Sequence, residues 1–223
     1  MKKQAVFLLS LVAIFFAACQ NTPSTEATVT AALPTAQTDE TATGLYTLNT
    51  GTSVIEWIGS KPTGSQHTGT IKLQSGELNV FQGNITGGKM VIDMNSLAVA
   101  DLEGADKTDL ESHLKDSDFF EVGKFPTGSF EFGSTLPLSG DPSGAKQLVT
   151  GALTLKGISK AIRIPFNMSV EGSKVKVETP EFSINRTEWG VKYKSGTIGT
   201  MKDKMIDDFV KLKIKLEAEK AVQ

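Results

Sequence analysis

The sequence has one cysteine and only two histidines. A single cysteine, Cys19, excludes an intramolecular disulfide. His67 and His113 are far apart, and no His-x-His or His-x-x-x-His spacing is present, so the sequence indicates no metal site. A Gly-x-Ser-x-Gly elbow and a glycine-rich phosphate loop are also missing. We therefore expect no catalytic nucleophile, no bound metal and no cofactor.

The remaining candidates for acid–base chemistry are weak. Glu77, Glu103 and Asp109 could be posed as such groups, but any chain of 223 residues offers similar carboxylates, and solvated side chains are the better interpretation. We expect His113 to form a hydrogen-bonded cap on a short helix, with contact to a ligand as the alternative. His67 lies among Gly, Ser and Thr residues, which predicts a solvated loop position.

Charge and composition favour one globular β domain. The 25 acidic residues outnumber the 23 basic ones, so nothing in the chain attracts nucleic acid. Hydrophobic residues make up 39% of the sequence, enough for a full core. The 21 glycines and the absence of long helical periodicity are typical of a protein built from strands and turns.

The first residues have the layout of an export signal. Lys2 and Lys3 precede an apolar run over residues 5–16, and two alanines stand directly before Cys19. The ending Phe-Ala-Ala-Cys resembles a lipoprotein signal, which predicts a signal peptide at 1–18 and lipidation of Cys19. The alternative is an ordinary signal cleaved near residue 18 that leaves a free thiol. Two or more acyl chains on Cys19 would hold the protein stably on a membrane.

Residues 19–44 are expected to be a flexible tether. Between 20 and 44 the chain is rich in threonine and has no lysine, arginine or aromatic residue. Such a segment cannot bury enough apolar surface to offset the entropy lost on ordering. We therefore expect an exported protein of the cell envelope, anchored to a membrane and facing the periplasm or the cell surface, with its folded domain at 45–220.

Alternation of apolar and polar residues runs through most of residues 45–220. The last run is the clearest, because Lys211, Lys213 and Lys215 alternate with apolar residues, giving a solvated face that could protect a sheet edge. Runs this short, separated by turn residues, predict an all-β fold, an antiparallel β-barrel of about eight strands. The expected strands are 45–49, 53–59, 68–73, 76–81, 89–94, 129–132, 147–155, 160–170, 174–178, 181–187 and 210–217.

One stretch interrupts the strands. Residues 96–118 lack alternation, and Leu110 and Leu114 are four apart, on one face of a short helix. Pro126 then ends any helical option and extends the residue before it. We expect this helical insertion to cover one end of the barrel.

Three motifs carry a resemblance to a known family. The most characteristic is His-Leu-Lys-Asp-Ser-Asp-Phe-Phe-Glu-Val-Gly-Lys-Phe-Pro-Thr at 113–127. Gly-Ala-Leu-Thr-Leu-Lys-Gly-Ile-Ser-Lys at 151–160 and Phe-Ser-Ile-Asn-Arg-Thr-Glu-Trp-Gly at 182–190 follow in the expected order. From 45 to about 218 the chain resembles the YceI-like family, bacterial proteins with a lipocalin-shaped barrel that bind polyisoprenoid lipids.

The resemblance implies a hollow barrel. An eight-stranded barrel is near the size at which side chains either fill the interior or leave room for one ligand, and an ordinary filled core is the plain interpretation of the many aromatic rings. A polyisoprenoid ligand would instead lie among inward-facing side chains, with any polar head near the helix. The predicted ligand-binding residues are Trp57, Ile71, Phe119, Phe120, Phe130, Phe132, Ile164, Phe166, Phe182, Ile184, Arg186 and Ile214.

Arg186 stands out in this set, because an arginine among apolar strand residues is seldom buried without a partner. It could be a paired arginine that staples the end of the barrel. It could also contact the polar head group of a ligand. The sequence leaves both roles open.

These features predict a membrane-anchored lipid-binding protein, not an enzyme. It would hold, sequester or transport a polyisoprenoid or similar long-chain amphiphile, such as a quinone or a polyprenyl lipid. The alternatives are an enzyme acting on a hydrophobic substrate and a structural or stress-related envelope protein with a filled barrel. The expected partners are the lipid and the membrane, and the chain could also form a homodimer.

Overall fold

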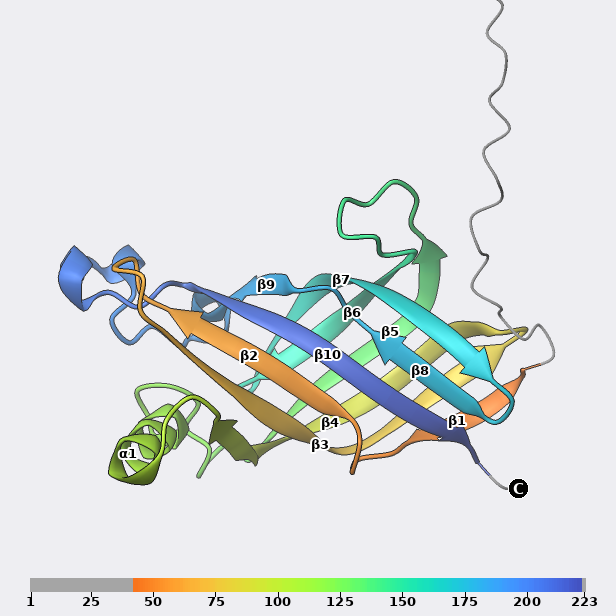
Figure 1. The fold of residues 1–223 in the computed structure, drawn as a ribbon, viewed down its shortest axis with the longest axis horizontal. Helices are drawn as coiled ribbons and strands as arrows, with labels where there is room; N and C mark the ends of the chain where they lie inside the picture. Colours follow the sequence, from red (N-terminus) through yellow and green to blue (C-terminus); the bar gives the residue numbers. More distant parts are fainter. Residues whose placement is uncertain (1–41, 222–223) are drawn as a thin grey trace, which may run out of the picture. The chain divides into compact units, whose positions relative to one another are not determined.

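The computed structural model describes residues 42–221, which form a ten-stranded antiparallel sheet, one α-helix and three short 3-10 helices (Figure 1). The predicted all-β fold with one helical insertion is confirmed. The predicted signal peptide, Cys19 and the tether up to residue 41 lie outside the described residues. The elements are β1 (Gly44–Leu48), β2 (Val54–Ser60), β3 (Gln66–Phe81), β4 (Asn84–Val99), α1 (Gly104–Lys115), β5 (Thr127–Pro137), β6 (Gln147–Leu155), β7 (Ile158–Glu171), β8 (Lys174–Glu178), β9 (Phe182–Asn185), η1 (Arg186–Trp189), η2 (Gly196–Ile198), η3 (Lys202–Lys204) and β10 (Phe209–Lys220).

The last strand, β10, closes the barrel. Its first half lies between β2 and β9, with Leu212 opposite both Trp57 and Phe182. Its second half lies between β1 and β8, with Ala218 opposite both Leu48 and Val175. Because β10 is paired on both sides, the expectation that its lysines protect a sheet edge was wrong.

The strands β3 and β4 are longer than the sequence predicted. The two expected strands at 68–73 and 76–81 are one strand, β3, whose register with β4 shifts between Leu73 and Ser75. A bulge therefore stands where the sequence indicated a turn. A Cβ atom at Gly76 would collide with the side chain of Leu48 on β1, so the glycine lets β1 approach β3 closely.

The expected strand at 181–187 is shorter than predicted. It ends at Asn185, whose side chain accepts a hydrogen bond from the Thr187 N–H at 3.0 Å and caps η1. Asparagine favours such local bonds over continued strand pairing. As a result, Arg186 begins a helical turn instead of lying within a strand.

The helix α1 lies at the opposite end of the barrel from β1 and β8 (Figure 1). Leu110 and Leu114 pack toward Trp57 and Val99, and the Val99 N–H donates a hydrogen bond to Glu111 Oε1 at 2.9 Å. No residue of α1 is fully buried, so the helix covers the end of the barrel without entering it. Within residues 42–221, no helix is both long and apolar enough to cross a membrane.

Candidate functional site

The barrel is hollow in one half and filled in the other. A cavity of about 210 Å³ lies in the half nearest α1. In the other half, side chains from β1, β3 and β8 fill the interior, and Tyr46, Leu78 and Val175 are fully buried there. The half of the barrel nearest α1 is therefore hollow, and the half at the other end is filled.

Most of the predicted ligand-binding residues surround the cavity. They come from β2, β3, β5, β7, β9 and β10, from the segment after α1 and from the start of η1. Their role in holding a ligand stays a prediction, but they share one apolar space. The residues in question are Trp57, Ile71, Phe119, Phe120, Phe130, Ile164, Phe182, Ile184, Arg186 and Ile214.

The other two predicted residues, Phe132 and Phe166, lie outside the cavity wall. Each is the next inward residue after a lining residue on its strand, Phe130 on β5 and Ile164 on β7. The ring of Phe132 stacks on that of Phe130 with centroids 5.4 Å apart, and Phe166 is only 3% exposed. These two rings belong to the filled half, where the cavity ends.

Several other lining residues were not among those predicted from the sequence. Met90, Ile92 and Met94 face the cavity from β4, and their alternation was visible in the sequence. Trp189 and Val191 also line it, but they follow the last predicted inward strand residue, where strand periodicity no longer applies. Their place in the wall follows from the fold, because η1 and the residues just after it lie against the cavity.

Polar lining residues gather at one end of the cavity. They belong to the β2–β3 hairpin and to Arg186, beside the loop that follows η1. Among residues 42–221, the basic side chains that line the cavity are Lys61, His67 and Arg186, and no carboxylate lines it. The cavity wall is therefore apolar along most of its length, and its polar groups gather at one weakly basic end.

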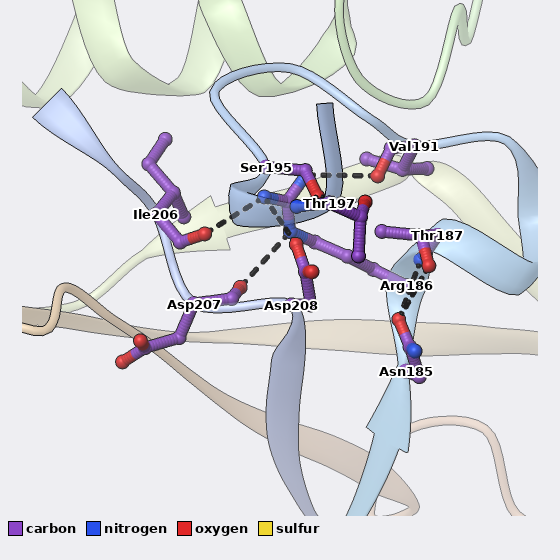
Figure 2. A network of polar contacts seen from close by, with 9 residues as sticks. All are labelled: Asn185, Arg186, Thr187, Val191, Ser195, Thr197, Ile206, Asp207 and Asp208. Carbon is purple, nitrogen blue, oxygen red and sulfur yellow. Dashed lines mark hydrogen bonds and ion pairs between the residues drawn. The ribbon is translucent and has the colours of Figure 1, made fainter. Parts of the chain in front are cut away.

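Arg186 is 4% exposed and ties η1 to the segment before β10 (Figure 2). Its Nε donates to the carbonyl of Asp207 at 3.0 Å, Nη1 to that of Val191 at 2.8 Å and Nη2 to that of Ile206 at 3.1 Å. A long ion pair of 3.5 Å joins Nη2 to Asp208 Oδ1. Burial lowers the pKa of Arg186, and the charge of Asp208 opposes this only in part.

These contacts make Arg186 a staple between two backbone segments, which is the first of its two predicted roles. The second role, contact with a ligand head group, stays a prediction, because the guanidinium also forms part of the cavity wall. The charges of Asp208 and Asp207 both favour the ionised guanidinium, although burial outweighs them. A guanidinium at the polar end suits an electron-rich group in a bound molecule.

The two tryptophans in the wall differ in one respect. Trp189 Nε1 donates a hydrogen bond to the carbonyl of Leu153 at 3.0 Å, which joins η1 to β6. Trp57 is 8% exposed, and its buried Nε1 has no acceptor within residues 42–221. A buried donor left without a partner costs about 1–3 kcal/mol. An acceptor atom of a bound molecule would remove this cost.

His67 lies in strand β3, so its predicted position in a solvated loop was wrong. Its Nδ1 is 2.9 Å from Asp101 Oδ2, and the same carboxylate accepts a hydrogen bond from the Thr68 N–H at 2.8 Å. Burial raises the pKa of Asp101, but these hydrogen bonds outweigh burial and hold it below the ordinary value. The pair fixes the end of β4 beside the polar end of the cavity.

His113 does not line the cavity. Its ring packs edge-on against Phe119 and Tyr193, with centroid distances of 5.1 and 4.8 Å, and its Nε2 lies 3.3 Å from Asp118 Oδ2. This cluster joins α1 to the loop after η1. No group of His, Cys, Asp or Glu residues between 42 and 221 could hold a metal ion, and Glu77, Glu103 and Asp109 are exposed, away from the cavity wall.

Comparison with known proteins agrees with this fold. BcnA of Burkholderia cenocepacia superposes with a TM-score of 0.60 at 18% identity, over 76% of this chain and 98% of that one. A polyisoprenoid binding domain from Saccharophagus degradans, implicated in plant cell wall breakdown, superposes with a TM-score of 0.57 at 15% identity, over 81% of this chain and 100% of that one.

Sequence comparison leads to the same family. A UPF0312 protein of Pseudomonas paraeruginosa is 30% identical over 105 residues, which is 44% of this chain, and the chain spans only 50% of that relative's length. The model of the YceI-like domain matches residues 46–218, nearly the whole of the barrel. The chain therefore belongs to the YceI-like family.

Proposed function

We propose that this protein binds one long-chain isoprenoid amphiphile in the hollow half of its barrel and holds or carries it at a membrane of the cell envelope. The observation that supports this most is the composition of the cavity wall, which is apolar along its length and polar only at the end beside the β2–β3 hairpin and Arg186. The ligand's tail lies against the apolar wall and its head at the polar end.

The chemistry of a polyisoprenoid suits such a wall. Its tail has no hydrogen-bonding group, so its affinity must come from apolar burial, about 0.8 kcal/mol for each buried methylene-sized group before the entropy cost of binding. A head with an acceptor oxygen, as in a quinone or a polyprenyl alcohol, can accept from Trp57 Nε1 or lie near Arg186. A binding role also suits a wall in which no carboxylate is available for acid–base chemistry.

The test is extraction of ligand from the purified protein. Native mass spectrometry should show one bound species whose mass reappears in an organic extract. Ile71→Trp and Ile162→Trp fill the cavity and should lower the bound fraction at least about tenfold. Phe81→Trp also introduces a tryptophan, but at an exposed residue, and should leave binding unchanged.

The thermal stability of these variants separates two explanations of any loss. In a hollow barrel, the added rings cost little, because they enter empty space. In a filled one, overpacking would cost about 1–3 kcal/mol. Wild-type protein without any extractable lipid, together with unstable tryptophan variants, would reject the proposal and favour a filled structural barrel.

We further propose that Cys19 carries the lipid anchor. It is the only thiol and stands directly after Ala17 and Ala18. Cys19→Ser should move the exported protein from the membrane fraction to the soluble fraction, and Ser10→Ala in the same leader should not. If wild type and Cys19→Ser are both soluble, the anchor is rejected. Neither proposal requires a homodimer, which stays a prediction.

A further inference from the structure

The loop between η1 and β10 forms one side of the polar end of the cavity. We call residues 192–204 of this loop the lip. Its base is fixed: the Ile206 N–H donates to the Lys194 carbonyl at 2.9 Å, the Asp207 N–H donates to the Ser60 carbonyl at 2.9 Å, and Ser195 is fully buried. The lip therefore stands beside the β2–β3 hairpin, at the same end of the barrel as α1 (Figure 1).

The tip of the lip exposes large apolar side chains. Ile198, the last residue of η2, is 58% exposed. Met201, directly before η3, is 63% exposed. Phe209, at the start of β10, is also exposed. Several exposed apolar residues in one short segment indicate an interaction surface, whereas isolated ones do not.

Lysines flank these apolar residues along the chain. Within the lip, Asp203 is the single acidic residue, although acidic residues outnumber basic ones in the whole chain. The lysines are exposed, and none of them forms an ion pair with residues 42–221. The neighbouring hairpin adds one more. The lysines of this surface are Lys61, Lys192, Lys194, Lys202 and Lys204.

The opposite side of the cavity end has the other charge. The helix α1 and the residues just after it carry five carboxylates against two lysines, Lys107 and Lys115, so this side has an excess of negative charge: Asp106, Asp109, Glu111, Asp116 and Asp118. An anionic surface would attract the lip and repel the α1 side. The charges therefore orient the barrel with the lip, not α1, toward such a surface.

We propose that the lip docks this protein on an anionic lipid bilayer, with Ile198 and Met201 entering the interface and the lysines lying at the phosphate level. This inference rests on the proposed function, because a polyisoprenoid is insoluble and must enter from and leave to a lipid phase. Apolar residues among lysines are the composition of surfaces that lie in the bilayer interface. Docking places the polar end of the cavity against the lipid.

Vesicle flotation tests the lip directly. All proteins carry Cys19→Ser, so that no acyl chain can contribute. The vesicles are phosphatidylcholine with or without roughly 30% phosphatidylglycerol, whose negative surface potential attracts lysines. The parent protein should bind anionic vesicles and release them at high salt. Ile198→Ser with Met201→Ser should weaken binding at least about tenfold, as should Lys202→Glu with Lys204→Glu.

The matched control is Phe81→Ser with Leu136→Ser, which removes two similarly exposed apolar residues away from the lip. It should bind vesicles like the parent. Equal binding by all variants, or equal loss in the control, would overturn the proposal. Circular dichroism must show the same melting temperature for all of them, and a variant that melts early is replaced by Ile198→Thr with Met201→Thr.

Two further readouts separate this proposal from the others. Bound ligand is measured by native mass spectrometry on the same proteins. Lip variants that keep their ligand but lose vesicle binding support the docking surface. If no protein carries a ligand, the proposed function is rejected, and vesicle binding is judged separately. If the parent protein does not bind vesicles but forms a dimer that the lip variants abolish, the lip contacts a second copy of the chain. This result would overturn lipid docking.

Discussion

Trp57 and Gly69 face each other across the β2–β3 ladder, and the indole of Trp57 occupies the space that a side chain at position 69 would need. A Cβ atom there would also meet the backbone carbonyl of Ala98 on β4. The glycine thus allows a large ring to lie flat on the sheet inside the barrel. The wall of the cavity depends on this pairing.

Gly69→Ala should therefore lower the free energy of unfolding by about 2–3 kcal/mol, since neither the indole nor the backbone carbonyl can move freely. Gly196→Ala is the control, because its new methyl would meet only the flexible end of Met205. Urea unfolding of both variants measures the difference. Similar losses at the two sites would show that Trp57 does not restrict position 69.

The two cavity tryptophans allow a matched comparison. Trp189→Phe removes a hydrogen bond to a buried carbonyl and should cost about 1–2 kcal/mol more than Trp57→Phe, which removes none. Trp57→Phe should instead reduce ligand retention, because the ligand loses its donor. The experiment pairs chemical denaturation with native mass spectrometry. Unchanged retention in Trp57→Phe would mean that the ligand does not use this nitrogen.

Truncations should reveal the boundary between the filled and hollow halves. Phe166→Ala, in the filled half, should lower the free energy of unfolding by about 3–5 kcal/mol. Ile214→Ala, on the cavity wall, should cost only about 1–2 kcal/mol in protein stripped of ligand, because the side chain has fewer partners to lose. Thermal and urea unfolding of stripped protein provide the numbers. Equal costs after correction for size would argue against an empty half.

This boundary was not predictable from the sequence. Alternation shows which face of a strand is inward, and it placed Phe130, Phe132, Ile164 and Phe166 correctly on that face. It says nothing of depth along the barrel, which depends on the register between strands far apart in the sequence. The predicted set therefore included two rings, Phe132 and Phe166, from the filled half.

Local interactions explain the other differences between the predicted elements and the structure. The sequence predicted the strand at 210–217 well, because its alternation is uninterrupted, but it could not show that this strand pairs on both sides. Residues 74 and 75 were expected to separate two strands, but the register shift there is a bulge within β3, and the next residue, Gly76, leaves space for Leu48. The cap by Asn185 ended β9 early and set Arg186 in a turn, where its donors reach backbone carbonyls.

Asp101 should give the protein a specific acid sensitivity. Its pKa is lower in the folded state than the ordinary value, so its contribution to stability is present above that value and is lost as the pH falls through the folded pKa. Asp101→Asn should cost about 1 kcal/mol or less at pH 7. At about pH 3, below the ordinary value, the difference from wild type should be smaller, because the stability contributed by the ionised carboxylate is being lost there.

Unfolding by urea at the two pH values measures this, with Asp141→Asn in an exposed turn as a control. A cost of Asp101→Asn that is the same at both pH values would show that the ionised carboxylate contributes nothing beyond what an amide can. His67→Gln provides a second check, since it removes one of the two groups that hydrogen-bond to Asp101.

The closing strand also sets the order in which this chain can fold. Tyr46, near the beginning of the barrel, pairs with Lys220 at its end, and β10 pairs with β1, β2, β8 and β9. A nascent chain without its last twelve-residue strand therefore exposes unpaired backbone on both flanks of the missing segment. Such long-range pairing slows folding to about milliseconds or longer. Until β10 is in place, the barrel stays vulnerable to aggregation and proteolysis.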